Sequence, residues 1–260
     1  MTCAQHANGR DWWLIQNRRD TVLTYLIDPS GINLHHEIIH EDVWGSYATG
    51  FTKFSPQGDR LAINHFISLD SQGVELVLAD FDRCNGLISN IRTNRSQSFE
   101  TSIFGPGLEF SPSGRYLYTN DVLSIYQLDT WADDVFSTKT MVAEYDGHID
   151  YSPSGTVERK SHFAQSQRAP DGKIYIGVTN SSYYFHIIHN PDLPGTDCNV
   201  EQHAIRLPTY FFGTVPTFPT LRLGPIDGSD CDTLDRDNNP VSRFRHEQDT
   251  LDHLALDFVD

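Results

Sequence analysis

The sequence lacks several features that mark common classes of protein. It has no apolar run of about 18 residues, so it contains no transmembrane helix and membrane insertion is not expected. No apolar stretch near its start resembles a signal peptide. It also has no G-x-S-x-G, no phosphate-binding glycine loop and no C-x-x-C pair. These motifs would have indicated a hydrolase, a nucleotide site or a zinc ribbon.

Clusters of basic residues are missing as well. The chain carries 19 Lys and Arg against 35 Asp and Glu, which gives a formal net charge of −16. A nucleic acid or an anionic membrane surface requires a basic face, so neither is an expected partner. Strong acidity keeps a protein in solution and is also compatible with Ca²⁺ capture.

Turn residues, in contrast, recur with a regular spacing. Phe-Ser-Pro-Gln-Gly stands at 54–58, Phe-Ser-Pro-Ser-Gly at 110–114 and Arg-Ala-Pro-Asp-Gly at 168–172, and their glycines lie 56 and 58 residues apart. Ser, Pro and Gly in these slots are typical of a type I turn. We call these five-residue segments turn cassettes. A strand-like run of β-branched and aromatic residues follows each of them. A fourth, less complete copy of the turn cassette, Asn-Gly-Arg-Asp at 8–11, precedes the strand-like run Trp-Trp-Leu-Ile.

This repeat predicts stacked four-stranded units, the blades of a β-propeller. Each unit offers three strands after its cassette, and the stretch before the next cassette supplies the fourth. We therefore expect an all-β, β-propeller-like domain over residues 1–228, with four to five four-stranded blades that close a ring or leave an open arc. The turn-like residues 152–155 fall off the period and are interpreted as a loop insertion.

The chain after residue 228 has a different character. Residues 229–260 begin with an acidic, turn-rich run, as linkers do, and continue into alternating segments that suggest the start of a further β domain. Within the acidic run, Asp235, Asp237 and Asn239 have the alternation of a Ca²⁺ loop. However, Pro240 stands where that loop needs Gly, and His246 stands where it needs Glu. A solvated linker is the stronger interpretation, and no cofactor is predicted.

One segment matches a catalytic signature. His36-Glu37-Ile38-Ile39-His40 fits H-E-x-x-H, which binds zinc when both histidines lie on one face of a helix. The turn residues at 28–31 and the β-branched residues between the histidines favour a strand instead. Four residues of strand span about 13 Å, and two ligands of one zinc ion must lie far closer together. The segment is therefore not expected to be a peptidase site.

The sequence contains four cysteines, and several pairings are open. They are Cys3, Cys84, Cys198 and Cys231. Buried free thiols are one interpretation. The other is a disulfide between Cys198 and Cys231, both of which stand in loop-like surroundings, provided that the compartment is oxidising.

Aromatic residues gather before the end of the predicted propeller. Tyr210, Phe211 and Phe212 stand between Thr209 and Gly213 and form the predicted binding surface. The competing interpretation is that they pack the last blade against its neighbour.

Four segments together carry a family resemblance. The chain resembles the WD-repeat-like β-propeller regions of bacterial surface proteins, on the segments His6–Trp13, Phe110–Tyr118, Ala169–Tyr175 and Asn190–Asp192 with Gly195 and Cys198. The resemblance covers about residues 6–225. In that family a PKD-type β-sandwich and a type IX secretion sorting segment follow the propeller. The resemblance implies a secreted or cell-surface location, but it implies no catalytic residues.

The leading functional hypothesis is a non-enzymatic extracellular binding or scaffold module that contacts protein or glycan through blade loops. The alternatives are a propeller-type hydrolase or lyase with a metal at the central funnel, and a structural spacer. Three or more His, Asp or Glu side chains converging at the centre would favour the enzyme. An open arc would also expose a sheet edge through which copies of the chain could associate.

Overall fold

The computed structural model describes residues 1–18, 21–39, 50–67, 73–97, 106–179, 181–212, 215–218, 223–234, 245–248 and 256–259. Its regular structure consists of strands, with two short 3-10 turns, η1 (Val135–Thr138) and η2 (Gly195–Cys198). No helix in these ranges is long and apolar enough to cross a membrane. The prediction of an all-β fold is confirmed.

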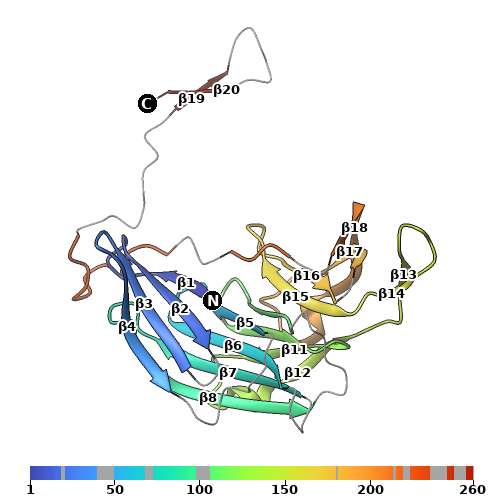
Figure 1. Ribbon diagram of the computed structural model, residues 1–260, viewed down its shortest axis with the longest axis horizontal. Coiled ribbons are helices and arrows are strands. Elements are labelled where there is room, and N and C mark those ends of the chain that lie inside the picture. Colours follow the sequence, from blue (N-terminus) through green and yellow to red (C-terminus); the bar gives the residue numbers. More distant parts are fainter. Residues whose placement is uncertain are drawn as a thin grey trace.

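Four sheets of four antiparallel strands make up most of the described part of the chain, and each sheet is a simple meander. We call these sheets blades 1 to 4. Blade 1 consists of β1 (Thr2–Gln5), β2 (Trp12–Arg18), β3 (Thr21–Asp28) and β4 (Gly31–Ile39), and blade 2 consists of β5 (Gly50–Phe54), β6 (Arg60–Ile67), β7 (Gly73–Phe81) and β8 (Ile88–Gln97). Blade 3 consists of β9 (Leu108–Phe110), β10 (Tyr116–Asn120), β11 (Ser124–Asp129) and β12 (Thr140–Glu144), and blade 4 consists of β15 (Phe163–Arg168), β16 (Ile174–Val178), β17 (Ser181–Ile188) and β18 (Val200–Phe212). The inner strands β1, β5, β9 and β15 are neighbours in this order, which is the arrangement of a β-propeller-like fold (Figure 1).

Each turn cassette joins the first and second strands of a blade. In blade 2 the Gly58 amide donates to the Ser55 carbonyl at 2.9 Å. Gly58 has a φ of +72°, and Gly9, Gly114 and Gly172 occupy the same place with φ of +72°, +77° and +81°. Glycine adopts this conformation without strain, which explains its recurrence. One detail of the prediction was wrong: the strand before each cassette pairs with the strand after it, so it opens a blade rather than completing the previous one.

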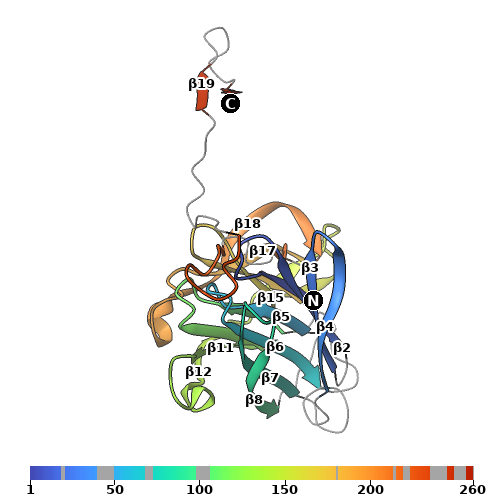
Figure 2. The ribbon, with the colours of Figure 1, turned by 90° about the vertical axis from the view of Figure 1, so that its left-hand side faces the viewer.

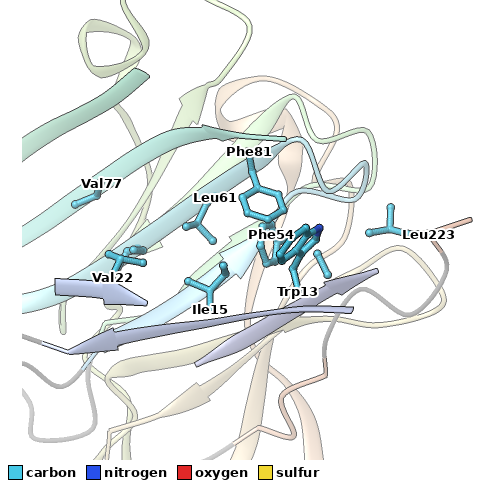
Figure 3. Close-up of a cluster of buried hydrophobic side chains, with 10 residues drawn as sticks. Trp13, Ile15, Val22, Phe54, Leu61, Val77, Phe81 and Leu223 are labelled. Atoms are coloured by element: carbon cyan, nitrogen blue, oxygen red, sulfur yellow. The ribbon is translucent and has the colours of Figure 1, made fainter. Parts of the chain in front are cut away.

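Apolar clusters between adjacent sheets hold the blades together. The cluster between blades 1 and 2 consists mainly of Ala4, Trp13, Ile15, Val22, Phe54, Leu61, Ile63, Val77 and Phe81. The Trp13 ring is 1% exposed and lies edge-on to the Phe81 ring, with 6.4 Å between centroids (Figure 3). Similar clusters join blade 2 to blade 3 and blade 3 to blade 4. Each large buried side chain stabilises the fold by roughly 1.5–3 kcal/mol.

The four blades form an arc, with blade 1 at one end and blade 4 at the other (Figure 1). The chain then returns from blade 4 to blades 1 and 2 through a segment that we call the strap, described at residues 215–218 and 223–234. The Ile226 amide donates to the Ala7 carbonyl at 2.8 Å. Leu223 joins the apolar cluster between blades 1 and 2. The strap therefore links the two ends of the arc.

Two hairpins lie outside the blades. Strands β13 (Ile149–Tyr151) and β14 (Glu158–Lys160) pair with each other around the turn at 152–155, which confirms the predicted insertion. Strands β19 (Arg245–Gln248) and β20 (Leu256–Val259) form a second hairpin, which lies apart from the blades in both views (Figures 1 and 2). The predicted further β domain after residue 228 stays a prediction.

Candidate functional site

Three polar side chains from three blades meet at the centre of the arc. Lys53 on β5, Glu109 on β9 and Gln167 on β15 each precede the last residue of an inner strand. The Lys53 Nζ donates to Glu109 Oε2 at 3.0 Å and to Gln167 Oε1 at 2.8 Å. The Lys53 and Glu109 side chains are 7% and 4% exposed. Such a buried pair requires its remaining hydrogen-bonding capacity to be satisfied.

The protein satisfies this network internally. The Glu109 carboxylate also accepts hydrogen bonds from the Phe110 amide and the Arg168 amide, each at 3.1 Å. The Gln167 oxygen accepts a further hydrogen bond, at 3.1 Å, from the Phe218 amide of the strap. The network therefore joins blades 2, 3 and 4 to the strap. The opposite charges of Lys53 and Glu109 neutralise one another within it.

A cavity of about 290 Å³ opens beside this network. It is lined by β1, β5 and the strap, through Met1, Thr2, Cys3, Gly50, Phe51, Thr52, Lys53, Thr217 and Phe218. The Phe218 side chain is 60% exposed. Burial raises the pKa of the Cys3 thiol, so this side chain is a poor nucleophile at neutral pH. The lining combines hydroxyl groups with aromatic rings and is of the size that takes a small ligand.

A second polar cluster lies between blade 4 and the β13–β14 hairpin. The rings of His148 and His203 stack with centroids 4.0 Å apart, and the His186 ring lies 5.1 Å from that of His203. Burial, and then the neighbouring His203, lower the pKa of His186 to about 3. Burial also lowers the pKa of His203, whose Nδ1 lies 3.5 Å from the Asp146 carboxylate. At neutral pH the His186 and His203 rings are therefore uncharged.

Neither cluster has the donor set of a metal centre. Across the described ranges, no group of three or more His, Cys, Asp or Glu side chains is arranged to hold a metal ion. The residues that meet at the centre of the arc are a lysine, a glutamate and an amide, rather than the convergent His and acidic residues that would favour a funnel metal. The weak metal candidates Asp235, Asp237 and Asn239 lie outside the described residues, so they stay a prediction.

The described part of the H-E-x-x-H segment, residues 36–39, lies on a strand, as expected. His36 and Glu37 belong to β4, the outer strand of blade 1, while His40 lies outside the described residues. The His36 Nε2 is 3.0 Å from the Asn85 carbonyl, a contact with blade 2. The ring therefore contributes to the contact between two blades.

The predicted binding surface lies at the end of β18. The Tyr210 ring packs on Tyr183, with centroids 5.0 Å apart, and the Phe211 ring packs on Phe185 at 4.6 Å. Phe212 pairs with Ser181 across the sheet. Tyr210 and Phe211 are half-buried. The Tyr210 and Phe211 rings therefore pack within blade 4. The role of Tyr210, Phe211 and Phe212 in binding stays a prediction.

The predicted disulfide is corrected by the structure. Cys231 of the strap is bonded to Cys84, which stands in the turn after β7, and not to Cys198. Cys198 is a free thiol, fully buried between blades 3 and 4. The sequence suggested a bond that closes the last unit onto the segment after it, because both residues stand in loop-like surroundings. The return of the strap across the arc, which no local pattern encodes, brings Cys231 to blade 2 instead.

The sequence analysis did not predict the network of Lys53, Glu109 and Gln167, although the spacing of these residues could have indicated it. Lys53, Glu109 and Gln167 stand at one fixed position before the three cassettes, 56 and 58 residues apart. Three polar residues at the same position of the first strand of each unit indicate a shared place at the axis. The histidine cluster gives no such signal, because the inserted hairpin supplies His148.

The fold is similar to that of known β-propeller-like proteins. A candidate 6-phosphogluconolactonase from Bacteroides uniformis matches at 15% identity over 79% of this chain and 54% of its own, with a TM-score of 0.48. The periplasmic gluconolactonase of Pseudomonas aeruginosa matches at 13% identity over 82% of this chain and 56% of its own, with a TM-score of 0.44. A candidate TolB from Agrobacterium tumefaciens matches at 16% identity over 82% of this chain and 81% of its own, with a TM-score of 0.33.

The chain spans just over half the length of the two lactonase structures. No family model matches the sequence, and no curated protein matches it. At these levels of similarity a shared activity does not follow from a shared fold, and function rests on the residues of the chain itself.

Proposed function

We propose that the chain is a non-enzymatic binding module that takes a neutral, hydroxyl-rich ligand, such as the end of a glycan, in the central cavity. The observation that carries this proposal is the neutralisation of Lys53 by Glu109 beside the cavity, at 3.0 Å. An anionic ligand would compete with a buried carboxylate for that lysine, and a neutral one would not. Thr52, Thr217 and the exposed Phe218 also line the cavity, and a lining of hydroxyl-bearing and aromatic residues suits a sugar with polar edges and an apolar face.

The location of such a module is part of the proposal. A disulfide joins Cys84 to Cys231, and disulfides persist in oxidising compartments. This supports a secreted or cell-surface module, in line with the resemblance to bacterial surface proteins. Attachment to PKD-type domains and export by type IX secretion stay expectations of that resemblance.

Titration calorimetry with a panel of neutral mono- and oligosaccharides tests the ligand class. We expect at least one sugar to bind, and Phe218→Ala to weaken its binding at least tenfold, about 1.4 kcal/mol. Trp131→Ala is the matched control, because Trp131 is also 60% exposed but lies in the turn after β11. Absence of sugar binding, or equal binding by the Phe218→Ala variant, would reject the proposal.

The same samples separate binding from catalysis. The alternative hydrolase or lyase would convert a bound sugar or lactone, and proton NMR would show the product over time. Thermal melting in Ca²⁺, in Zn²⁺ and in chelator tests for a metal in the whole chain, including residues 235–239. A large increase in Tm with one metal, together with turnover of the sugar or lactone, would reject the binding-module proposal in favour of the enzyme. If the chain neither binds a ligand nor turns one over, the structural-spacer hypothesis is favoured.

A further inference from the structure

The strap lies on the turns of blades 1 and 2 without joining their sheets. None of the described strands contains a strap residue. Leu223 and Pro225 are buried against two turn glycines: a Cβ on Gly58 would stand 2.7 Å from the Leu223 side chain, and a Cβ on Gly9 would stand 2.8 Å from Pro225. The strap therefore has a defined position, which side chains on these two turns would fill.

Few hydrogen bonds hold the strap in this position. The Ile226 amide donates to the Ala7 carbonyl at 2.8 Å, and the Arg83 guanidinium donates to the Gly224 carbonyl. Beyond Ile226, in the part of the strap that the structure describes, the amides that donate to a backbone carbonyl do so within the strap itself. So few bonds offset little of the conformational entropy that an ordered segment loses.

A covalent bond adds to this weak attachment, and it is open to reaction. Cys231 of the strap is bonded to Cys84 in the turn between β7 and β8, and both residues are half-buried. A dithiol reductant can attack this disulfide: one of its thiolates forms a mixed disulfide with one cysteine and displaces the other, and its second thiolate then displaces the first. Two electrons and two protons pass to the cysteines, which become thiols, while the dithiol becomes a disulfide.

The strap also forms part of the central cavity. Thr217 and Phe218 line it, and Phe218 stands five positions before Leu223 in the sequence. The Phe218 amide donates to Gln167 Oε1 at 3.1 Å, the oxygen that also accepts from Lys53 Nζ. A neutral hydrogen bond holds an exposed ring only weakly. The place of Phe218 in the lining therefore depends on the position of the strap residues that follow it.

We propose that the Cys84–Cys231 disulfide is a redox latch, a bond whose reduction frees the strap and changes the central cavity. In the oxidised chain the latch keeps Phe218 in the lining. Reduction by a dithiol takes Phe218 out of the lining and weakens ligand binding, while the blades stay folded. This inference rests on the proposed function, in which Phe218 contacts the sugar. The module then holds its ligand in an oxidising compartment and releases it where a dithiol reductant is present.

The packing of the blades on one another does not require the latch. Among the described residues, Leu223 is the one strap residue in the buried apolar clusters, and the other buried members of these clusters belong to the blades. The antiparallel pairing within each blade is likewise independent of the strap. Reduction should therefore release the strap at 25 °C before it unfolds a blade.

Hydrogen exchange followed by mass spectrometry tests the latch without a ligand. The oxidised chain is compared with the chain in dithiothreitol at 25 °C. We expect the Phe218 and Ile226 amides to exchange at least tenfold faster after reduction, with an unchanged circular dichroism spectrum. Unchanged exchange in the strap would overturn the latch. Loss of the folded spectrum would show that the bond supports the whole fold, and would also overturn it.

Titration calorimetry tests the effect on the cavity, with the neutral sugar that binds the oxidised chain most tightly. We expect dithiothreitol to raise its Kd at least tenfold. An unchanged Kd together with faster exchange in the strap would overturn the link between the latch and the cavity. If no sugar binds, the proposed function fails, and the exchange of the Phe218 amide alone decides whether the latch controls the lining.

The double variant Cys84→Ser/Cys231→Ser is the matched control. Without reductant it should exchange and bind as the reduced wild type does, and dithiothreitol should change neither its exchange nor its Kd. A further effect of dithiothreitol on this variant would assign the redox response to the free thiols Cys3 or Cys198, and the latch would be wrong.

Discussion

At the scale of single residues, the centre of the arc depends on a buried ion pair. Lys53 bonds both Glu109 and Gln167, and its replacement would leave the Glu109 carboxylate buried without a counter-charge. We expect Lys53→Met to lower the free energy of unfolding by about 3 kcal/mol. Urea unfolding measures this loss. The double variant Lys53→Met/Glu109→Gln, which removes both charges and keeps an acceptor for the Phe110 amide, should recover a large part of it. A single variant as stable as the wild type would show that the pair is not required.

The histidine cluster predicts a dependence of stability on acid pH. The pKa of His186 falls from an ordinary 6.5 to about 3 in the folded state, so below pH 6.5 the unfolded state binds the extra proton. Stability is therefore fully present above pH 6.5 and is lost as the pH falls toward 3, with a slope of up to about 1.4 kcal/mol per pH unit for one proton. His186→Gln retains an acceptor for the His203 amide and should flatten this slope.

Urea unfolding at pH 7.5, 6 and 4.5 checks the slope. An unchanged slope in the His186 variant would assign the acid sensitivity to other groups.

At the scale of the element, the turns between strands place strict limits on substitution. Gly86 lies in the turn between β7 and β8 with a φ of +67°, and a Cβ there would stand 2.6 Å from the Trp13 ring. Gly155 has a similar φ of +70°, in the β13–β14 turn, with no atom within 4 Å of such a Cβ. We expect Gly155→Ala to cost about 1 kcal/mol through backbone strain alone. Gly86→Ala adds an overpacked contact and should cost about 3 kcal/mol.

Urea unfolding of the two glycine variants gives the comparison. Equal losses would mean that the turn at Gly86 shifts to make room and that the Trp13 ring does not depend on its close approach.

At the scale of the whole molecule, the disulfide fixes the strap across the arc. Cys84 and Cys231 are 147 residues apart in sequence, so their bond closes most of the propeller into one loop. Removing such a bond typically costs about 2–5 kcal/mol. We expect the double variant Cys84→Ser/Cys231→Ser to melt well below the wild type, and a reducing agent to lower the wild-type Tm by a similar amount.

Cys3→Ser is the control for this pair, because Cys3 is a free thiol, and it should melt within about 2 °C of the wild type. Non-reducing peptide mapping identifies the bonded pair directly. A Cys198–Cys231 peptide, or a double variant with the wild-type Tm, would contradict the structural assignment.

The local structure of the chain follows from its sequence alone. Glycines at 58, 114 and 172 mark turns, and the β-branched and aromatic runs after them become strands, because a tight turn and an extended chain depend on neighbouring residues only. The same local reasoning correctly placed His36 on a strand. The repeat then predicted the blades, since identical units that cannot bury a face alone must stack.

The contacts that join these units arise from packing between blades. The meeting of Lys53, Glu109 and Gln167 depends on three blades facing one axis, and the partner of Cys231 depends on the path of the strap. Contacts between residues more than fifty positions apart depend on the packing of whole sheets, so no pattern within one repeat could specify them.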